Sequence, residues 1–346
     1  MLTEELRAEV ACLKRERDAV VLAHYYVPTE VQELADHVGD SFALASLAAT
    51  LPASTLVFAG VRFMAESAKL LSPDKTVLMP DASADCPMAH MVRRETVDAA
   101  REKYGDDLAV ACYVNSTAEV KSWSDVCVTS SNAVRIVSAL PQRNVLFIPD
   151  RHLGRYVAGQ VAEKNVILND GFCPIHQAIS ADEVRALRDS LPGAPVLAHP
   201  ECGPEVMELA DVAGSTSQIV EAAAAPGPGA RGAAPPAGGG VVWARGGGGG
   251  APSLRGAAPA AGEERDYIVL TVDGVRGELE RRCAGMGKRF HFPPTRPVCP
   301  DMERITAEGV AACLREGSGE VGLPPKEVAA PARAALARML ELGASR

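Results

Sequence analysis

The chain has 346 residues, more than the roughly 250–300 at which a single hydrophobic core stops growing, so two or three domains are expected. Its 35 basic and 44 acidic side chains give a net charge of −9 at pH 7. This balance argues against a nucleic-acid-binding protein, because such a protein presents a basic face. No apolar run reaches the roughly 18 residues that cross a bilayer, and the N-terminus reads as a charged amphipathic helix rather than a signal peptide. We therefore expect a cytoplasmic protein without a membrane partner.

The predicted elements of the N-terminal part form a series that begins with a helix over 3–18. A short apolar strand ending in VLAHYY (21–26) follows, and the turn GDS (39–41) then opens an alanine-rich helix. A second buried strand, TLVFAG (55–60), leads into an amphipathic helix, and a last strand runs into Cys86. Short apolar strands that alternate with helices predict an α/β unit with a small parallel sheet.

The same series appears twice more along the chain. Its helices are expected at 94–104 and 180–190, and its first strands are AVACYVNS (109–116) and VLAHPEC (196–202). In every copy 17 positions separate a residue at the end of the first strand from a Ser/Thr-rich turn: His24 from Ser41, Cys112 from Thr129, and His199 from Thr216. Three intervals that agree in this way indicate an internal repeat.

The third copy is longer than the other two. From the first strand to the closing cysteine there are 62 positions in the first copy, 61 in the second and 100 in the third. The surplus is a Gly/Pro/Ala-rich stretch at 226–262, which cannot bury enough apolar surface to offset its ordering entropy and is expected to be disordered. We predict an α/β protein of three pseudo-threefold-related domains, each with a small parallel sheet flanked by helices. The expected domains are 1–88 with 301–346 packed on it, 89–176, and 177–300.

Each copy ends at a cysteine, and the three cysteines share a second feature. Cys86, Cys173 and Cys299 are all followed by proline, whereas the other six cysteines are not. Three thiolates converging from three domains could bind zinc, with the fourth position open for catalysis. They could instead bind a [4Fe–4S] cluster in which one iron lacks a protein ligand and acts as a Lewis acid. The alternative is that they are buried cysteines at strand ends.

Side chains with acid/base chemistry lie at the ends of the first strands. A lone buried His or Tyr is more often a core residue. Ligands, however, gather at the carboxyl ends of parallel strands, which favours a functional role here. The candidates are His24 and Tyr26 in the first copy, Tyr113 and Asn115 in the second, and His199 and Glu201 in the third. Tyr25 alternates to the other face of its strand and is expected to be structural.

Hydroxyl side chains stand at the turns where the next helices are expected to begin. They are Ser41, which follows Asp40, then Thr129 and Ser130, and Ser215 and Thr216. Free N–H groups and the helix dipole make such a turn a natural site for a phosphate or a carboxylate. Simple N-capping explains each turn taken singly, whereas three turns around one axis favour a ligand with several anionic groups.

These stretches together resemble the quinolinate synthase family of NAD biosynthesis. The resemblance covers residues 1–221 and 266–346 and rests on AHYY with GDS, AGVRFMAESAKLLSP, CYVNSTAEVKSWSDVCVTSSNAV, GFCPIHQ, HPEC with GSTSQ, and CPDMERIT. It implies three α/β domains that meet at a central [4Fe–4S] cluster with one open iron, whose ligands would be Cys86, Cys173 and Cys299. It also implies an enzyme that condenses iminoaspartate with dihydroxyacetone phosphate, releases phosphate and water, and closes the pyridine ring.

The resemblance further implies roles for individual side chains. Tyr26 and Glu201 would be the main proton-transfer groups, and His199 and Tyr113 would complete the catalytic set. The substrate-binding residues would be His24, Ser41, Tyr113, Asn115, Ser130, His199, Glu201, Ser215 and Thr216. The partners would be the two small-molecule substrates and, functionally, the enzyme that supplies iminoaspartate.

The chain departs from the family pattern at three places. The insertion at 226–262 is not a family feature. Relatives usually have Thr-Glu where this chain has Thr271-Val272, so the role of that acid is absent or shifted to Asp273. No further cysteine stands just before the last ligand, so no local disulfide switch is expected. Cys202 in HPEC falls early in its repeat and lacks the following proline, and we assign it to structure.

Three other functions fit parts of the pattern. A different [4Fe–4S] hydro-lyase acting on a hydroxy acid would share the open iron and the carboxylate-binding turns. A zinc hydrolase with three cysteine ligands fits less well, because thiolate-only zinc sites are usually structural and closed. An iron–sulfur electron carrier or sensor would leave the acid/base residues without a role.

Overall fold

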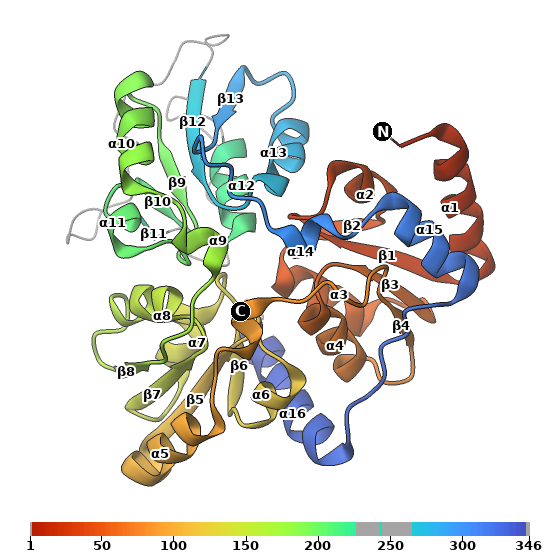
Figure 1. The fold of residues 1–346 in the computed structure, drawn as a ribbon. Helices are drawn as coiled ribbons and strands as arrows, with labels where there is room; N and C mark the ends of the chain where they lie inside the picture. Colours follow the sequence, from red (N-terminus) through yellow and green to blue (C-terminus); the bar gives the residue numbers. More distant parts are fainter. Residues whose placement is uncertain (1, 226–241, 244–264, 344–346) are drawn as a thin grey trace. The chain divides into compact units, whose positions relative to one another are not determined.

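The computed structural model describes residues 2–225, 242–243 and 265–343. Helices and strands alternate along the chain, and the strands form three separate sheets (Figure 1). The α/β class and the three small sheets predicted from the sequence are therefore confirmed. Within the insertion predicted to be disordered, Val242 and Trp243 form a short strand, and the rest of that prediction lies outside the described residues.

The chain divides into two compact units. The first comprises the chain up to Cys173 together with the part from Cys299 to the C-terminal helix, and it holds the first and second sheets. The second runs from Pro174 to Val298 and holds the third sheet. Each unit has a hydrophobic core of its own.

The first sheet has the strand order β2-β1-β3-β4, and its strands are all parallel. Its central strands β1 and β3 are continuous apolar runs, as expected for a parallel sheet covered by helices on both faces. The strands are β1 (Ala19–His24), β2 (His37–Gly39), β3 (Thr55–Ala59) and β4 (Thr76–Leu78). The helices are α1 (Glu4–Glu16), α2 (Thr29–Leu34), α3 (Ser41–Thr50), α4 (Arg62–Leu71) and the 3₁₀ helix η1 (Pro87–His90).

The second sheet repeats this order as β6-β5-β7-β8, again with parallel strands. The strands are β5 (Leu108–Tyr113), β6 (Val126–Val128), β7 (Asn144–Ile148) and β8 (Asn165–Leu168). The helices are α5 (Arg94–Tyr104), the 3₁₀ helix η2 (Gly105–Asp107), α6 (Ala118–Ser122), α7 (Ala133–Ala139) and α8 (Arg151–Ala158).

The third sheet has the order β11-β10-β9-β12-β13, which is the same order with one strand added at the edge. The added strand, β11 (Val242–Trp243), pairs antiparallel with β10. The other strands are β9 (Val196–Ala198), β10 (Val212–Ala213), β12 (Arg265–Leu270) and β13 (Lys288–His291). The helices are α9 (Pro174–Gln177), α10 (Ala181–Ser190), α11 (Pro204–Met207), α12 (Thr216–Ala224), the 3₁₀ helix η3 (Asp273–Val275) and α13 (Arg276–Arg282).

One strand register recurs in all three sheets. The first and second strands pair residues fifteen positions apart: His24 with Gly39, Tyr113 with Val128, and Ala198 with Ala213. The first and third strands pair residues 36 positions apart in the first two sheets, for example Val20 with Leu56 and Leu108 with Asn144. In the third sheet this interval is 72, from Ala198 to Leu270, because the insertion lies between the two strands. The internal repeat in the sequence is thus a repeat of strand register.

An aspartate before each second strand ties that strand to the first one, and the sequence analysis did not single it out. Three carboxylates each accept a backbone N–H from fifteen positions earlier: Asp36 from Val21 at 2.8 Å, Asp125 from Val110 at 2.7 Å, and Asp211 from Val196 at 2.9 Å. The backbone N–H of each aspartate donates in return to the carbonyl oxygen of the same valine. The repeat therefore extends to individual hydrogen bonds.

The C-terminal residues form α14 (Pro300–Glu303), α15 (Ala307–Glu316) and α16 (Lys326–Gly343). Helix α15 packs on α1, α2 and β3 of the first sheet, whereas α16 packs chiefly on α6 and β6 of the second sheet and also contacts α4. The C-terminal residues therefore contact the second repeat as well as the first, on which they were expected to pack. The domain boundaries 1–88, 89–176 and 177–300 stay a prediction. No helix among the described residues is long and apolar enough to span a membrane.

Candidate active site

Cys86, Cys173 and Cys299 occupy the same kind of local structure. Each directly precedes a proline that opens a short helix, namely η1, α9 and α14. Their side chains are partly exposed, whereas five of the other six cysteines are buried and Cys12 is exposed. All three lie in the first compact unit and pack against its hydrophobic core. Partly exposed thiols in one recurring backbone setting are donors that could bind a metal, and their chemistry suits an iron–sulfur cluster or zinc.

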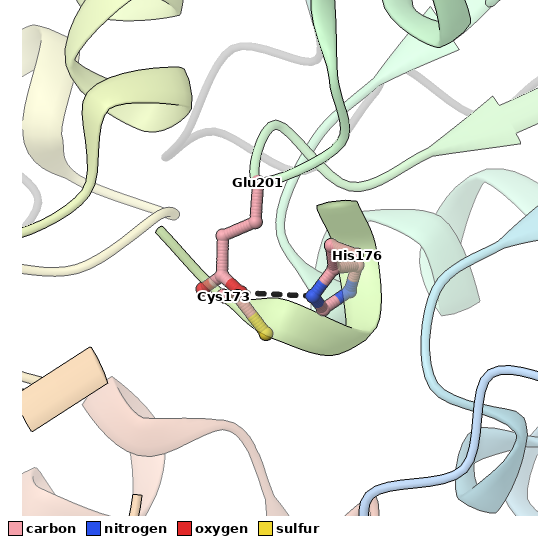
Figure 2. A group of neighbouring side chains, drawn as sticks. All are labelled: Cys173, His176 and Glu201. Carbon is pink, nitrogen blue, oxygen red and sulfur yellow. Dashed lines mark ion pairs between the residues drawn. The ribbon is translucent and has the colours of Figure 1, made fainter. Parts of the chain in front are cut away.

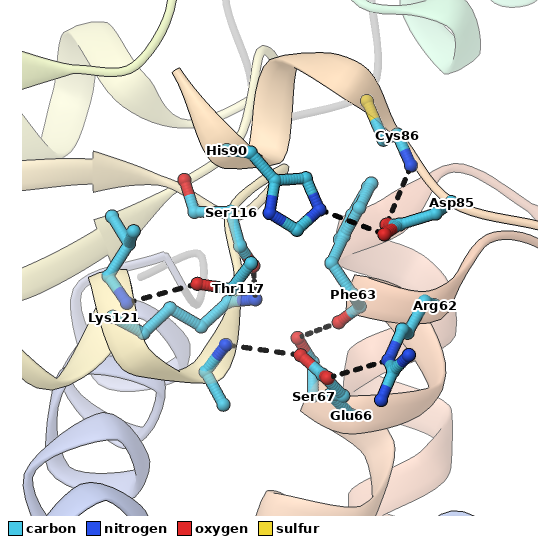
Figure 3. Close-up of polar contacts among 12 residues, drawn as sticks. Arg62, Phe63, Glu66, Ser67, Asp85, Cys86, His90, Ser116, Thr117 and Lys121 are labelled. Atoms are coloured by element: carbon cyan, nitrogen blue, oxygen red, sulfur yellow. Dashed lines mark hydrogen bonds and ion pairs between the residues drawn. The ribbon is translucent and has the colours of Figure 1, made fainter. Parts of the chain in front are cut away.

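Aspartate carboxylates hold the backbone of two of these cysteines. Cys86 donates its N–H to Asp85 Oδ1 at 2.8 Å, and Asp85 Oδ2 lies 2.8 Å from His90 Nε2 (Figure 3). The sulfur of Cys86 points away from this carboxylate in the same view. Cys173 donates its N–H to Asp150 Oδ2 at 3.2 Å, while Oδ1 of the fully buried Asp150 caps α8. The backbone from which each thiol projects is therefore held in place.

In the first sheet, the predicted residues His24 and Tyr26 lie together at the end of β1. Tyr26 donates its N–H to His24 Nδ1 at 3.2 Å, and the two rings meet edge to face with their centroids 4.5 Å apart. The intervening Tyr25 is buried. Ser41 is the first residue of α3, and Asp40 caps that helix through its carboxylate.

In the second sheet, Tyr113 ends β5 and is buried, and Asn115 follows in the next turn. The side-chain oxygen of Asn115 is buried and has no hydrogen-bond partner in the described part of the chain. Because a buried acceptor without a partner costs about 1–3 kcal/mol, this oxygen favours a ligand that donates a hydrogen bond. Ser130 does not open a helix as predicted, because the Asn132 side chain accepts the Thr129 N–H at 2.7 Å and closes a turn before α7 begins.

In the second unit, four polar side chains make contact at the strand ends. His199 and Glu201 follow β9, Thr271 follows β12, and His176 lies on α9. His176 Nδ1 lies 2.9 Å from Glu201 Oε2 (Figure 2), and His176 Nε2 lies 3.0 Å from Thr271 Oγ1. The rings of His176 and His199 stack with their centroids 4.8 Å apart. All four residues are at most 3% exposed, so this is a buried polar cluster.

His199 repeats the hydrogen bond of His24. Glu201 donates its N–H to His199 Nδ1 at 3.3 Å, as Tyr26 does to His24. A ring nitrogen that accepts a hydrogen bond carries no proton, so the neutral form of each imidazole has its proton on Nε2. The two copies of Val-Leu-Ala-His thus present the same tautomer, each two positions before a predicted acid/base residue.

Ser215 and Thr216 stand at the start of α12. Ser215 caps the helix: its side chain accepts the Gln218 N–H at 3.3 Å, and the Gln218 side chain accepts the Ser215 N–H at 2.8 Å. Thr216 is the first helical residue and is buried. Capping is thus an observed role of Ser215, and substrate binding by both residues stays a prediction.

Sequence reasoning did not assign His176 or Thr271. A signal for His176 was present in GFCPIHQ, where a histidine follows a cysteine by three positions and so falls about one helical turn later. The nearby acid Asp273 is buried and pairs with Arg276 at 3.0 Å and with Arg296. Asp273 therefore has a structural role as an ion-pair partner beside Thr271.

Proton-transfer side chains at the ends of parallel strands mark this chain as an enzyme that acts on small molecules. Comparison with known families is more specific: the family described as Quinolinate synthetase A protein matches residues 8–230 and 253–341. The chain belongs to this family, which confirms the resemblance drawn from its motifs. The internal gap in the match, 231–252, falls inside the predicted insertion at 226–262.

Curated relatives match the chain over nearly its whole length. The quinolinate synthase of Fusobacterium nucleatum is 40% identical over 337 residues, which cover 97% of this chain and 99% of the relative. That of Methanoregula boonei is 40% identical over 340 residues, or 98% of this chain and 99% of the relative. That of Aquifex aeolicus is 39% identical over 344 residues, or 98% of this chain and 94% of the relative.

Proposed function

We propose that the chain is a quinolinate synthase that condenses iminoaspartate with dihydroxyacetone phosphate to form quinolinate, releasing phosphate and water. The observation that carries this proposal is the matched pair of strand ends, His24–Tyr26 and His199–Glu201, in a chain that belongs to this family. The reaction needs carbon–carbon bond formation, imine–enamine tautomerisation and dehydration, and each of these steps moves protons. We expect it to run in the cytoplasm, with a functional link to the enzyme that supplies iminoaspartate.

Cys86, Cys173 and Cys299 would hold a [4Fe–4S] cluster, whose open iron supplies a Lewis acid for the departure of hydroxide. The hydrogen bonds from the backbone N–H of Cys86 and Cys173 to aspartates support this role, because they hold the chain from which those ligands project. No change of oxidation state is needed in the overall reaction.

Glu201 and Tyr26 would move the protons. Removal of a proton from the carbon beside the imine generates the enamine that attacks the triose, and the buried Glu201 carboxylate suits a base for this step. Loss of water requires a proton on the leaving hydroxyl group. The Tyr26 phenol, packed against the His24 ring, suits a donor for that step, and Tyr113 would assist from the end of β5.

The remaining residues would bind the anionic groups of the substrates. His199, with its proton on Nε2, would donate to the phosphate of the triose together with Ser215 and Thr216. His24 would donate to a carboxylate, assisted by hydroxyl and amide groups on the other strand ends: Ser41, Tyr113, Asn115, Ser130 and Thr216. The buried acceptor oxygen of Asn115 suits an N–H or O–H of the substrate.

Iron and acid-labile sulfide in anaerobically purified protein test the metal site first. We expect about four of each per chain, with loss in Cys86→Ser, Cys173→Ser and Cys299→Ser. Cys202→Ser is the matched control and should keep both, because the Cys202 thiol is buried and donates to the Leu270 carbonyl. Zinc, or no metal, would contradict the cluster.

Quinolinate formation and phosphate release are then measured with iminoaspartate and dihydroxyacetone phosphate. Both should appear together in the wild-type enzyme and be absent from the three cysteine variants. A protein that holds the cluster but releases no phosphate, and that dehydrates a hydroxy acid instead, would replace this proposal with the hydro-lyase.

A further inference from the structure

We propose that His176 and Thr271 are positioning residues for Glu201. They would form a chain of hydrogen bonds in which the Thr271 hydroxyl holds the His176 ring and the His176 ring holds the Glu201 carboxylate for proton transfer. This inference rests on the proposed function, because it assigns to Glu201 the proton-transfer role described above.

The direction of both hydrogen bonds follows from the chemistry of the groups. An ionised carboxylate only accepts, so the contact of 2.9 Å between Glu201 Oε2 and His176 Nδ1 places a proton on that nitrogen. The other nitrogen of a neutral imidazole is then an acceptor, and Nε2 lies 3.0 Å from the Thr271 hydroxyl, which can donate to it. The Glu201 carboxylate therefore fixes the tautomer of His176, and the Thr271 hydroxyl supports that tautomer by donating to Nε2 and holding the ring.

The elements that carry these residues hold the arrangement in place. Thr271 directly follows β12, a central strand of the third sheet, and His176 lies within α9. The His176 ring is fixed from a third direction by stacking on His199. His176 is 1% exposed and Thr271 is 0% exposed, so bulk water does not compete for these bonds.

Burial also explains why Glu201 needs such a partner. A carboxylate removed from water is costly in its ionised form, and it takes up a proton when no donor compensates it. A protonated carboxyl group cannot act as a base. The hydrogen bond from the His176 N–H stabilises the ionised carboxylate of Glu201. It also holds one carboxylate oxygen in place and so sets the orientation of the group.

Two pairs of matched variants separate this role from a general packing role. The side-chain amide of His176→Asn reaches the place of Nδ1 and can still donate to Glu201, whereas that of His176→Gln reaches the place of Nε2 and cannot. Thr271→Ser keeps the hydroxyl, and Thr271→Val removes it with little change of volume. A packing role predicts losses that follow size, whereas a positioning role predicts losses that follow the hydrogen bond.

The experiment measures kcat and KM for quinolinate formation in the holoenzyme, with iron and sulfide content determined for every variant. We expect His176→Gln to lower kcat by about 100-fold with KM changed by less than about threefold, the loss typical of an impaired acid/base group. His176→Asn should retain at least about ten times more activity than His176→Gln. Thr271→Ser should stay close to wild type, and Thr271→Val should lower kcat, but by less than His176→Gln does, because it leaves the contact between His176 and Glu201 in place.

Each outcome decides the inference. Equal losses in His176→Asn and His176→Gln, or in Thr271→Ser and Thr271→Val, would overturn it, and so would losses confined to KM. Loss of iron in a variant with low activity would show that the residue supports the neighbouring cysteine instead, and would also overturn it. If the wild-type protein holds its cluster and forms no quinolinate, the proposed function fails and this inference fails with it.

Discussion

Lys121 is a buried charge beneath the loop that follows β5. Its side chain has no exposed surface, and its ammonium group donates to the Ser116 carbonyl and lies 5.4 Å from the centroid of the Phe63 ring (Figure 3). Burial lowers the pKa of Lys121, and the nearby Cys127 and Cys112 thiols act to raise it. The two cysteines face each other across strands β5 and β6 in the paired register. This polar cluster underlies the loop that carries the predicted substrate-binding residue Asn115.

The first prediction concerns the pH dependence of stability at Cys112. Burial raises the pKa of its thiol, but hydrogen bonds with Cys127 and Ser116 and the charge of Lys121 outweigh this effect and lower the pKa from 9.0 to about 7. The folded state therefore binds fewer protons than the unfolded state between these values, and the free energy of unfolding rises with pH across that window. The contribution of Cys112 is complete above pH 9.0 and is lost below about pH 7.

Urea unfolding of the wild type and of Cys112→Ala at pH 6.5, 7.5 and 8.5 checks this prediction. The stability difference between the two proteins should widen as the pH rises. The raised pKa of Cys127 acts above its ordinary value of 9.0, outside this window. Cys313→Ala is the matched control, because burial raises the pKa of that thiol to about 12 and its effect should be constant between pH 6.5 and 8.5. A constant difference for Cys112→Ala as well would show that its thiol is not ionised in this range.

At the scale of elements, the internal repeat could be predicted from the sequence, whereas the side-chain contacts between distant segments could not. The spacing between strand and turn survives in the chain as a fixed interval, so the three parallel sheets and the strand ends that carry His24 and His199 could be predicted. The contact between His176 and Thr271 joins residues 95 positions apart, and no local pattern encodes it. The aspartates before the second strands could not be predicted for the same reason, because each forms its hydrogen bond with a residue of the neighbouring first strand.

The second prediction tests one of these aspartates. Asp211→Ala should lower the free energy of unfolding by about 1–3 kcal/mol, because the N–H of Val196 that its carboxylate binds at 2.9 Å lies in a buried strand and loses its partner. Asp211→Asn keeps a side-chain acceptor and should lose less. Asp189→Ala, at an exposed position of α10, is the control and should change the urea midpoint little. Equal effects in Asp211→Ala and Asp189→Ala would mean that this hydrogen bond contributes nothing to stability.

At the scale of the whole molecule, the chain passes between its two compact units next to two of the predicted cluster ligands. The first unit ends at Cys173 and resumes at Cys299. Within that unit the C-terminal helices join the two sheets, because α15 packs on the first and α16 chiefly on the second. From the sequence, residues 301–346 were expected to pack on the first repeat. The contacts of α16 with α6 and β6 came only from the structure, because the periodicity of a helix does not define the surface that it covers.

The last prediction concerns the insertion. In the first two repeats four residues join the helix after the second strand to the third strand: 51–54 between α3 and β3, and 140–143 between α7 and β7. In the third repeat α12 ends at Ala224 and β12 begins at Arg265. Deleting residues 227–262 would leave four residues in this connection and would restore the interval of 36 positions that pairs the first and third strands in the other sheets. We therefore expect the shortened enzyme to fold and to keep quinolinate synthesis within about threefold of wild type, since the removed stretch lies outside every predicted site residue.

The measurement is kcat/KM together with iron and sulfide per chain, compared with a shorter deletion of 244–262 that retains β11. Among the described residues, the edge strand β11 pairs two residues with β10, so its removal should cost little. Loss of activity in the longer deletion alone would show that β11 is needed. Loss in both, with the cluster intact, would show that the insertion takes part in catalysis. Full activity in both would place the function of this enzyme entirely in the three repeats and the C-terminal helices that join two of them.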